Sequence, residues 1–309
     1  MRTDSRTDSP GALVVPAPAL AAASVAKRPA ASGRKRWSRA VLYIVFSVIA
    51  IPFLFPTWWM ITSSFKSVNE ILSFPPSLIP LSPSMEAYVK AFTFQPFAQQ
   101  YFNSMYIAVV VTLTTMLISS MAGYAFARIR FRGQNILFLV VLVGLLIPSE
   151  VTIVPLFQMF NSLGLVNTHW PLILVTSFGA PSVLATFIMR QFFISLPGEL
   201  EEAARLDGLG RPGIWWKIAM PLAKPALSAV AIFTFLNVWN LYLEPTVYLS
   251  SPDLFTLPQA LTRFVDAYSG PMWNVQLAAA TLTALPVLIV FVVAQRQFVE
   301  GLAQTGLKG

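Results

Sequence analysis

Long apolar runs separated by short polar connections make up most of the chain. A membrane-spanning helix needs about 20 mostly apolar residues, so each long run is a candidate span. The runs predict six spans, over residues 40–63, 103–127, 135–157, 170–194, 225–247 and 274–296. We therefore expect an all-α, polytopic membrane protein. Four tryptophans fall near the predicted outer ends, where amphipathic rings prefer the lipid–water interface: Trp58, Trp59, Trp170 and Trp273.

The composition indicates that lipid is the main solvent of this chain. Its 309 residues are 56% hydrophobic and only 11% charged, whereas a soluble domain is about a quarter charged. The absence of cysteine excludes disulfides, thiolate nucleophiles and cysteine-based metal sites. His169 is the only histidine, which excludes multi-histidine metal centres. We therefore expect no catalytic and no metal-binding residue.

The positive charge of the chain lies mainly on one side of the predicted membrane. With the N-terminus inside, only Lys66, Lys90 and Arg263 fall in outer segments. Every other lysine and arginine then faces the cytoplasm, where membrane proteins carry an excess of these residues. The distribution predicts an N-in, C-in topology. It also explains the net charge of +8 without a nucleic-acid partner.

Two segments outside the spans have distinct compositions. Residues 1–36 are rich in Ala, Pro, Ser and Arg and predict a disordered, basic cytoplasmic tail ahead of a transmembrane domain over 37–309. A secretory signal is the alternative, but Pro16 and Pro18 interrupt its apolar run and a span follows. The proline-dotted segment 65–102 predicts an outer cap loop with a short helix near 84–92.

The connection over residues 195–225 is too long and too polar for a simple turn between two spans. Ser195 and Pro197 can start a short helix, and Glu201 can pair with Arg205 four residues later. Glycines and prolines after Asp207 stop this helix, and a second short helix follows. The sequence predicts helix, tight turn and helix on the cytoplasmic side, with Leu200, Ala203, Ala204 and Asp207 on one face of the first helix.

This connection carries a motif that resembles the signature loop of ABC importer inner-membrane permeases. The matching positions are Glu202-Ala203-Ala204, Gly208, Ile218 and Met220-Pro221, with Met220 as the only departure, in place of leucine. Further segments resemble the carbohydrate-type branch of these permeases and the smaller maltose-type permease: 163–168, Trp239-Asn240, 256–258 and 301–309. The resemblance covers residues 40–309.

The resemblance implies that the loop inserts into a cleft of a cytoplasmic ATPase subunit. Glu202, Ala203, Ala204, Asp207 and Gly208 would make the contact, and a side chain at Gly208 would open the turn. Ile218 and Pro221 would complete this coupling loop. An amphipathic loop lying on lipid headgroups is the alternative. Against it, an anionic leaflet would repel three closely spaced glutamates, Glu199, Glu201 and Glu202.

The same resemblance implies a set of partners in a bacterial cytoplasmic membrane. These are a second permease subunit, two ATPase subunits and an extracytoplasmic solute-binding protein. The tail 301–309 nearly matches a phosphate loop, but Leu307 stands where the lysine is required. We therefore expect this chain to bind no cofactor, and ATP with Mg²⁺ to bind on the partner subunits. The resemblance leaves open whether the tail reaches the ATPase interface.

The fifth predicted span carries polar and aromatic side chains near the membrane midplane. These are Asn237, Trp239, Asn240, Tyr242 and Glu244. Asn237, Asn240 and Glu244 follow an i, i+3, i+7 spacing and would share one helix face. Amides and aromatic rings suit a sugar, which predicts a substrate pathway here. An interhelical hydrogen bond between two permeases is the alternative.

The sequence leaves the cargo and two other classes of protein open. A mono-, di- or oligosaccharide fits the resemblance, and a glycerophosphodiester or polyol is the alternative cargo. An ion-coupled secondary transporter would need intramembrane acid pairs, whereas only Glu150 stands out, after a predicted helix break at Pro148. A membrane-embedded enzyme would need a catalytic constellation that this sequence lacks.

Overall fold

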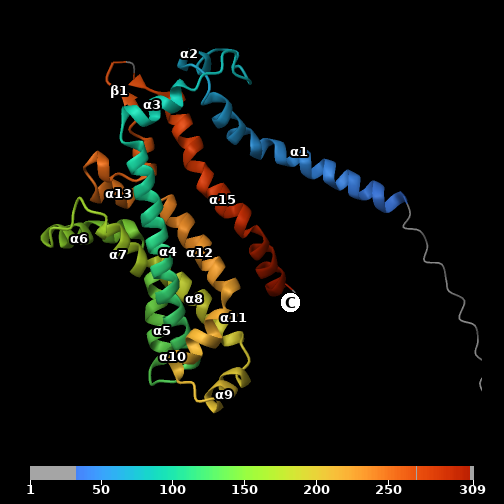
Figure 1. Cartoon of the computed structure of the whole chain (residues 1–309), viewed down its shortest axis with the longest axis vertical. Helices are drawn as coiled ribbons and strands as arrows, with labels where there is room; N and C mark the ends of the chain where they lie inside the picture. Colours follow the sequence, from blue (N-terminus) through green and yellow to red (C-terminus); the bar gives the residue numbers. More distant parts are fainter. Residues whose placement is uncertain (1–32, 269, 307–309) are drawn as a thin grey trace, which may run out of the picture. The chain divides into compact units, whose positions relative to one another are not determined.

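The computed structural model describes residues 33–268 and 270–306, which form two compact units (Figure 1). In the described part, the first unit is the beginning of helix α1 (Gly33–Ser63), up to Leu54. This helix starts three residues before the predicted end of the N-terminal tail, and residues 1–32 of that tail lie outside the described residues. The side chains from Val41 to Leu54 are exposed, as expected for a span that lipid surrounds.

Among the described residues, four helical segments are long and apolar enough to cross a membrane, and two bent helix pairs raise the number to six if each pair is one span. The four are Val41–Ser63 of α1, α4 (Phe97–Arg128), Trp170–Ser195, and Trp273–Val293 of α15 (Trp273–Gly306). The two bent pairs are Gln134–Leu146 with Ser149–Ser162, and Arg211–Leu222 with Lys224–Trp239. The all-α membrane fold is thus confirmed.

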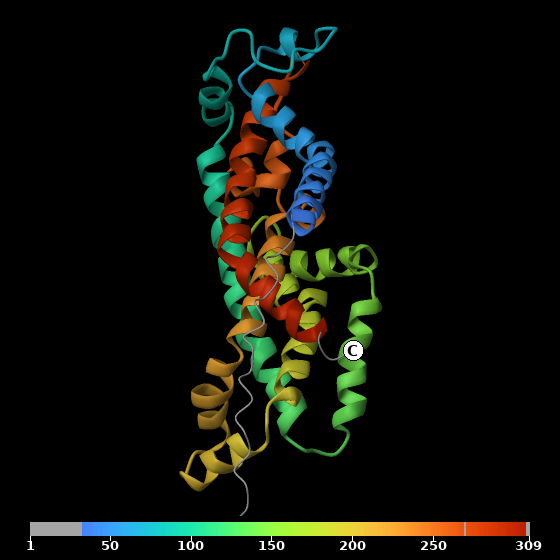
Figure 2. The same ribbon diagram turned by 90° about the vertical axis from the view of Figure 1, so that its right-hand side faces the viewer.

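The third predicted span, 135–157, is wrong as a single helix. It consists of α5 (Gln134–Val143), the short 3-10 helix η1 (Gly144–Leu146) and α6 (Ser149–Ser162). The two arms meet at 96° (Figure 2). Pro148 explains the break, because a proline disfavours helical geometry in the residue before it, and Ile147 is extended, with ψ 112°.

The fourth and fifth predicted spans are also interrupted. The fourth is α7 (Trp170–Phe178) followed by α8 (Ala180–Ser195), with extended backbone at Gly179. The fifth is α12 (Lys224–Trp239) followed, after Asn240–Tyr242, by α13 (Leu243–Tyr248). The prediction that Asn237, Asn240 and Glu244 share one face of one helix is therefore wrong, since α12 ends at Trp239.

Helix α4 packs against α7, α8 and α12 in the second unit (Figure 1). Gly123 permits the closest approach of α4 to α8, since a Cβ there would lie 2.7 Å from Met189 Cβ. One core cluster surrounds Trp239 and Phe97, and another surrounds Tyr124 and Phe193. The two clusters stabilise opposite ends of α4.

Short elements cover the end of α4 where it begins. They are α2 (Val68–Ile71), α3 (Glu86–Phe94), η3 (Pro252–Leu254), α14 (Leu257–Leu261), and the strands β1 (Val265–Asp266) and β2 (Gly270–Pro271). The two strands are antiparallel, with Val265 opposite Pro271. Helix α3 confirms the short helix predicted near residues 84–92.

Lys66 holds the segment that follows α1. Its amino group donates to the Ser77 carbonyl oxygen at 2.5 Å and lies 4.2 Å from the centre of the Trp59 ring. Burial lowers the pKa of this amino group below its usual value, and the nearby Glu70 carboxylate partly opposes that shift. A single charged side chain therefore ties the apolar 71–85 segment to the end of α1.

Candidate functional site

The predicted coupling loop folds into two short helical segments separated by a turn. The first is α9 (Glu199–Leu206). The second is a nearly continuous run of α10 (Arg211–Ile214), the π-helical η2 (Trp215–Ala219) and α11 (Met220–Leu222). Ser195 does not start α9 as predicted. It is the last residue of α8, and its Oγ donates to the Phe192 carbonyl oxygen at 2.7 Å.

Gly208 forms the turn after α9. Its φ is +83°, a conformation that residues with a side chain rarely adopt. The Leu209 amide then donates to the Ala204 carbonyl oxygen at 3.0 Å, which closes the end of the helix. A Cβ at Gly208 would meet no atom within 4 Å. The turn therefore requires glycine for its backbone conformation, since the space around this position is free.

An ion-pair network joins α9 to the end of α4. The Glu201 carboxylate lies 3.2 Å from Arg205, which confirms the predicted pair, and 3.2 Å from Arg128. Arg128 also donates to the Leu196 carbonyl oxygen, just before α9. In the sequence, Arg128 indicated only the orientation of the chain in the membrane. Its pairing with Glu201 could have been suspected because Arg128 ends a long apolar run on the same side of the membrane as the acidic loop.

Exposure separates the residues of the signature motif into two groups. Glu202, Ala203, Asp207, Gly208 and Pro221 are exposed, and Ile218 is half-buried against the second core cluster. Ala204 is only 4% exposed and belongs to that cluster. The prediction that Ala204 shares a contact face with Ala203 is therefore wrong, because Ala204 packs inward beside Glu201.

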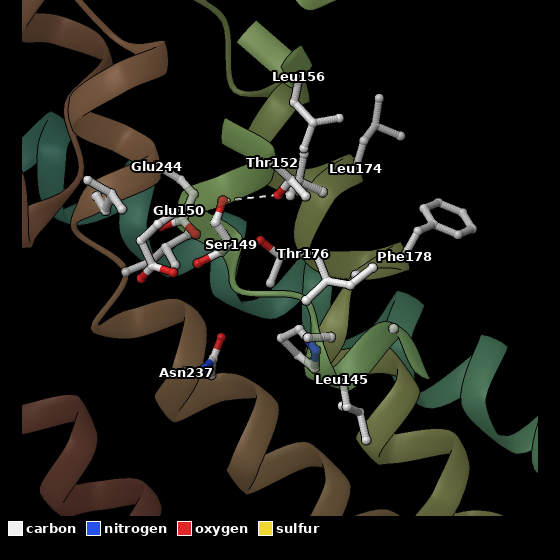
Figure 3. Close-up of a pocket in the computed structure, with 18 of the residues that line it drawn as sticks. Leu145, Ser149, Glu150, Thr152, Leu156, Leu174, Thr176, Phe178, Asn237 and Glu244 are labelled. Carbon is white, nitrogen blue, oxygen red and sulfur yellow. Dashed lines mark hydrogen bonds between the residues drawn. The ribbon is translucent and has the colours of Figure 1, made fainter. Parts of the chain in front are cut away.

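A large cavity opens where the broken helices meet. Its volume is about 1140 Å³, and its wall comes from α6, the α7–α8 junction, the end of α12 and the start of α13 (Figure 3). The predicted pathway residues Asn237, Asn240, Tyr242 and Glu244 all line it. These four residues therefore lie together because the helix breaks after Trp239, and not because they share one face of a continuous helix.

Trp239 is the exception among the predicted pathway residues. Its side chain is 1% exposed and lies in the core, away from the cavity. The indole Nε1 donates to the Thr283 carbonyl oxygen at 3.2 Å, and the ring stacks on Phe235 with centroids 5.5 Å apart. Assigning Trp239 to the pathway was therefore wrong: the residue joins α12 to α15.

The two asparagines differ in what they can offer to a solute. The Asn240 amide already donates to the Leu236 carbonyl oxygen at 2.7 Å, within its own helix end. Among the described residues, the Asn237 side chain has no hydrogen-bond partner. Neither amide bonds another helix in this part of the chain. Asn237 is therefore the freer of the two groups inside the cavity.

Three further cavity residues were not among the predicted pathway positions. Ser149, Glu150 and Thr176 all line the cavity. Glu150 follows the helix break at Pro148, and that break was the one sequence signal for its exposure. Thr176 lies in an apolar run, and no local pattern distinguishes it. Its position depends on the α7–α8 junction.

The described residues contain no group of three or more His, Cys, Asp or Glu side chains that could hold a metal ion. His169 precedes α7 and links two distant segments. Its ring pairs with the Tyr106 hydroxyl and with the Leu254 carbonyl oxygen, the latter at 2.7 Å. The only histidine of the sequence thus joins α4 to the η3 segment.

Comparison with known proteins gives consistent matches. Residues 116–304 match the family described as binding-protein-dependent transport system inner membrane component. The chain is 40% identical over 272 residues to the arabinooligosaccharides transport system permease AraQ of Halalkalibacterium halodurans, covering 87% of this chain and 96% of that protein. It is 36% identical over 281 residues to the diacetylchitobiose uptake system permease NgcG of Streptomyces coelicolor, covering 90% and 91%.

A solved structure shares the fold. A bacterial ABC transporter involved in the import of the acidic polysaccharide alginate matches with a TM-score of 0.74 at 23% identity, covering 87% of this chain and 99% of that one. The family match spans more than half of the sequence, and the relatives match over nearly their whole length. This chain therefore belongs to the inner-membrane permease components of binding-protein-dependent ABC importers, within the sugar and oligosaccharide branch, and is not an enzyme.

Proposed function

We propose that this chain is one of two permease subunits of an ATP-driven importer that carries a sugar across the cytoplasmic membrane. The broken helices line the cavity, and broken helices around a central site are typical of transporters that work by alternating access. Amides, hydroxyls and the exposed ring of Tyr242 meet there. Such a wall suits a sugar, which offers hydroxyls on its edges and an apolar ring face.

The coupling loop supplies the proposed contact with an ATPase subunit. Glu202, Ala203, Asp207 and Gly208 are exposed and form the docking face. Glu201, behind that face, is ion-paired to Arg128 at the end of α4. This pair is the observation that carries the proposal, because a displacement of α9 is transmitted directly to a helix that packs against α8 and α12. ATP and Mg²⁺ would bind on the partner subunits.

An extracytoplasmic binding protein would deliver the solute at the opposite side. The names of the matched relatives support a sugar cargo, since they include arabinooligosaccharide and diacetylchitobiose systems. The sn-glycerol-3-phosphate permease UgpE of Yersinia enterocolitica also matches, at 35% identity over 211 residues. It supports the alternative cargo, a glycerophosphodiester or polyol, and the phosphate of a glycerophosphodiester would distinguish it from a neutral sugar by charge.

The docking proposal is tested by co-purification of the tagged full-length chain from its native membrane. We expect an ATPase subunit to co-purify with the natural chain. It should be lost from the Ala203→Arg variant, because this substitution places a large charged side chain on the exposed face. Lys90→Gln, which changes the charge by the same single unit on exposed α3, is the matched control and should retain the ATPase. Failure of the unaltered chain to retain an ATPase subunit would contradict the proposed function.

A further inference from the structure

The wall that this chain gives to the cavity carries charge of one sign only. Glu150 and Glu244 both line it, and no lysine, arginine or histidine does. Figure 3 shows the two side chains on neighbouring parts of the wall. Within the described ranges, neither carboxylate takes part in an ion pair or hydrogen bond. Both charges are therefore left uncompensated by the part of the chain that the structure describes.

The same wall holds polar groups without partners. Thr176 is only 6% exposed, and its side chain points toward the cavity in Figure 3. Its hydroxyl has no hydrogen-bond partner among the described residues, and neither has the Asn237 amide. Polar groups that face a cavity and have no protein partner are available to a bound ligand or to water. The cavity thus offers neutral donors and acceptors next to two negative charges.

These charges act on any solute that enters. Clefts lined by one sign of charge, with apolar walls, focus the field and change the local concentration of ions by about tenfold or more. Leu156, Leu174 and Phe178 supply such apolar walls here. A phosphate, sulfonate or uronate would be repelled and would find no cation on this wall to pair with. A neutral sugar would not be repelled, and its hydroxyls can pair with the amide, hydroxyl and carboxylate groups of the wall.

We infer that Glu150 and Glu244 are specificity-determining residues that exclude anionic solutes, so the cargo is an uncharged or cationic sugar. This inference rests on the proposed function, because it takes the cavity as the solute pathway. An importer with this specificity would not carry the anionic solutes named for some relatives and structural neighbours: sn-glycerol-3-phosphate, sulfoquinovosyl glycerol and the acidic polysaccharide alginate. Selection against a wrong solute by unpaired like charge is a common means of specificity.

The natural absence of cysteine makes a direct test possible. Asn237→Cys places a single thiol in the cavity of the full-length chain, purified with its partner subunits. Two methanethiosulfonates of similar size, one carrying trimethylammonium and one carrying sulfonate, are reacted with it. Mass spectrometry of this chain gives both rates, so cysteines of other subunits do not contribute. Each rate is divided by the rate with free 2-mercaptoethanol.

We expect the normalised cation-to-anion rate ratio to be about ten or more, and to fall about tenfold in Glu150→Gln/Glu244→Gln. Glu150→Asp/Glu244→Asp should keep the high ratio, which separates charge from misfolding. Glu86→Gln, an exposed carboxylate on α3 outside the cavity, should not change it. A ratio of one or less, or one that the double Gln variant leaves unchanged, overturns the inference.

A third, uncharged methanethiosulfonate with a bulky benzyl group tests the proposed function separately. Its attachment at position 237 should abolish solute uptake by reconstituted vesicles, whatever the charge ratio is. Uptake that continues after complete labelling would remove the cavity from the pathway and so contradict the proposed function. A blocked pathway with no charge preference would contradict only the inference about Glu150 and Glu244.

Discussion

At the scale of single residues, backbone conformation at one glycine controls the coupling loop. Gly208 has a φ of +83° and open space around its Cα. In this conformation a residue with a side chain loses about 1–2 kcal/mol, and asparagine loses less than β-branched residues do. The motif therefore requires glycine because other residues would be strained at this φ. The size of the effect should depend on which residue replaces the glycine.

We expect Gly208→Val to uncouple ATP hydrolysis from transport while the chain still inserts and assembles. Gly208→Asn should retain most of the coupling, because asparagine tolerates positive φ. Substrate-stimulated ATPase activity in reconstituted vesicles measures this. Gly198→Ala is the control, since Gly198 has a φ of −67° and free space around it. Equal stimulation in the valine variant and the natural chain would contradict a coupling role for the turn.

The carboxylate of Glu201 is the second residue with a specific expected effect. Its side chain is 11% exposed between Arg128 and Arg205, which are 16% and 56% exposed. Breaking a buried ion pair costs up to about 3–5 kcal/mol, whereas an exposed pair is worth at most about 1 kcal/mol. We expect Arg128→Met to reduce substrate-stimulated ATPase activity strongly and Arg205→Met to reduce it only slightly. Equal losses would show that the pair with α4 has no special role.

At the scale of elements, a close helix crossing organises the second unit. A Cβ on Gly123 would lie 2.7 Å from Met189 Cβ and 2.8 Å from the Arg190 backbone nitrogen. Backbone atoms cannot move aside cheaply, so α4 and α8 would have to separate. No motif indicated this glycine in the sequence, because the contact joins residues that are far apart along the chain.

We expect Gly123→Val to lower the thermal unfolding midpoint in detergent by several degrees and to reduce folded yield. Gly213→Ala is the matched control, because its added methyl group would meet Leu209 Cδ2 at an ordinary 3.4 Å. Alanine is also about 1 kcal/mol more favourable than glycine within a helix. An unchanged midpoint for the valine variant would mean that the helices separate without cost.

The end of α12 separates a packing residue from a cavity residue. Trp239 is buried among Phe235 and Tyr101, and its replacement by alanine should cost about 3–5 kcal/mol in unfolding free energy. Asn237→Leu should instead leave stability nearly unchanged and reduce the rate of solute uptake. Thermal unfolding and uptake assays on both variants check this division. Normal uptake by the leucine variant would show that the Asn237 amide does not contact the solute.

At the scale of the whole molecule, the predicted topology places α3 outside and the coupling loop inside. Thr93 on α3 and Lys217 in η2 are both exposed and can each carry the only cysteine of the chain. In intact spheroplasts, an impermeant maleimide should label Thr93→Cys at once and Lys217→Cys only after permeabilisation. The reverse pattern would contradict the N-in, C-in prediction.

The sequence by itself determined the class of the protein and the local chemistry of the coupling loop. Apolar runs and the asymmetry of positive charge depend directly on the lipid environment, so they predict the spans and their orientation. The glycines that follow Asp207 end the first helix of the loop through their local backbone conformation. The pair of Glu201 with Arg205 was also predictable, since residues four apart in a helix are neighbours.

Only the tertiary structure decided which residues share a site. Breaks at Pro148, Gly179 and Asn240 bring Glu150, Thr176 and Glu244 to one cavity, and they turn Trp239 into the core. Ala204 is buried, although its neighbour Ala203 is exposed, because α9 packs against the second core cluster. All of these differences have the same physical reason. Periodicity in the sequence predicts the faces of a helix, but distant residues decide where the helix breaks and what each face packs against.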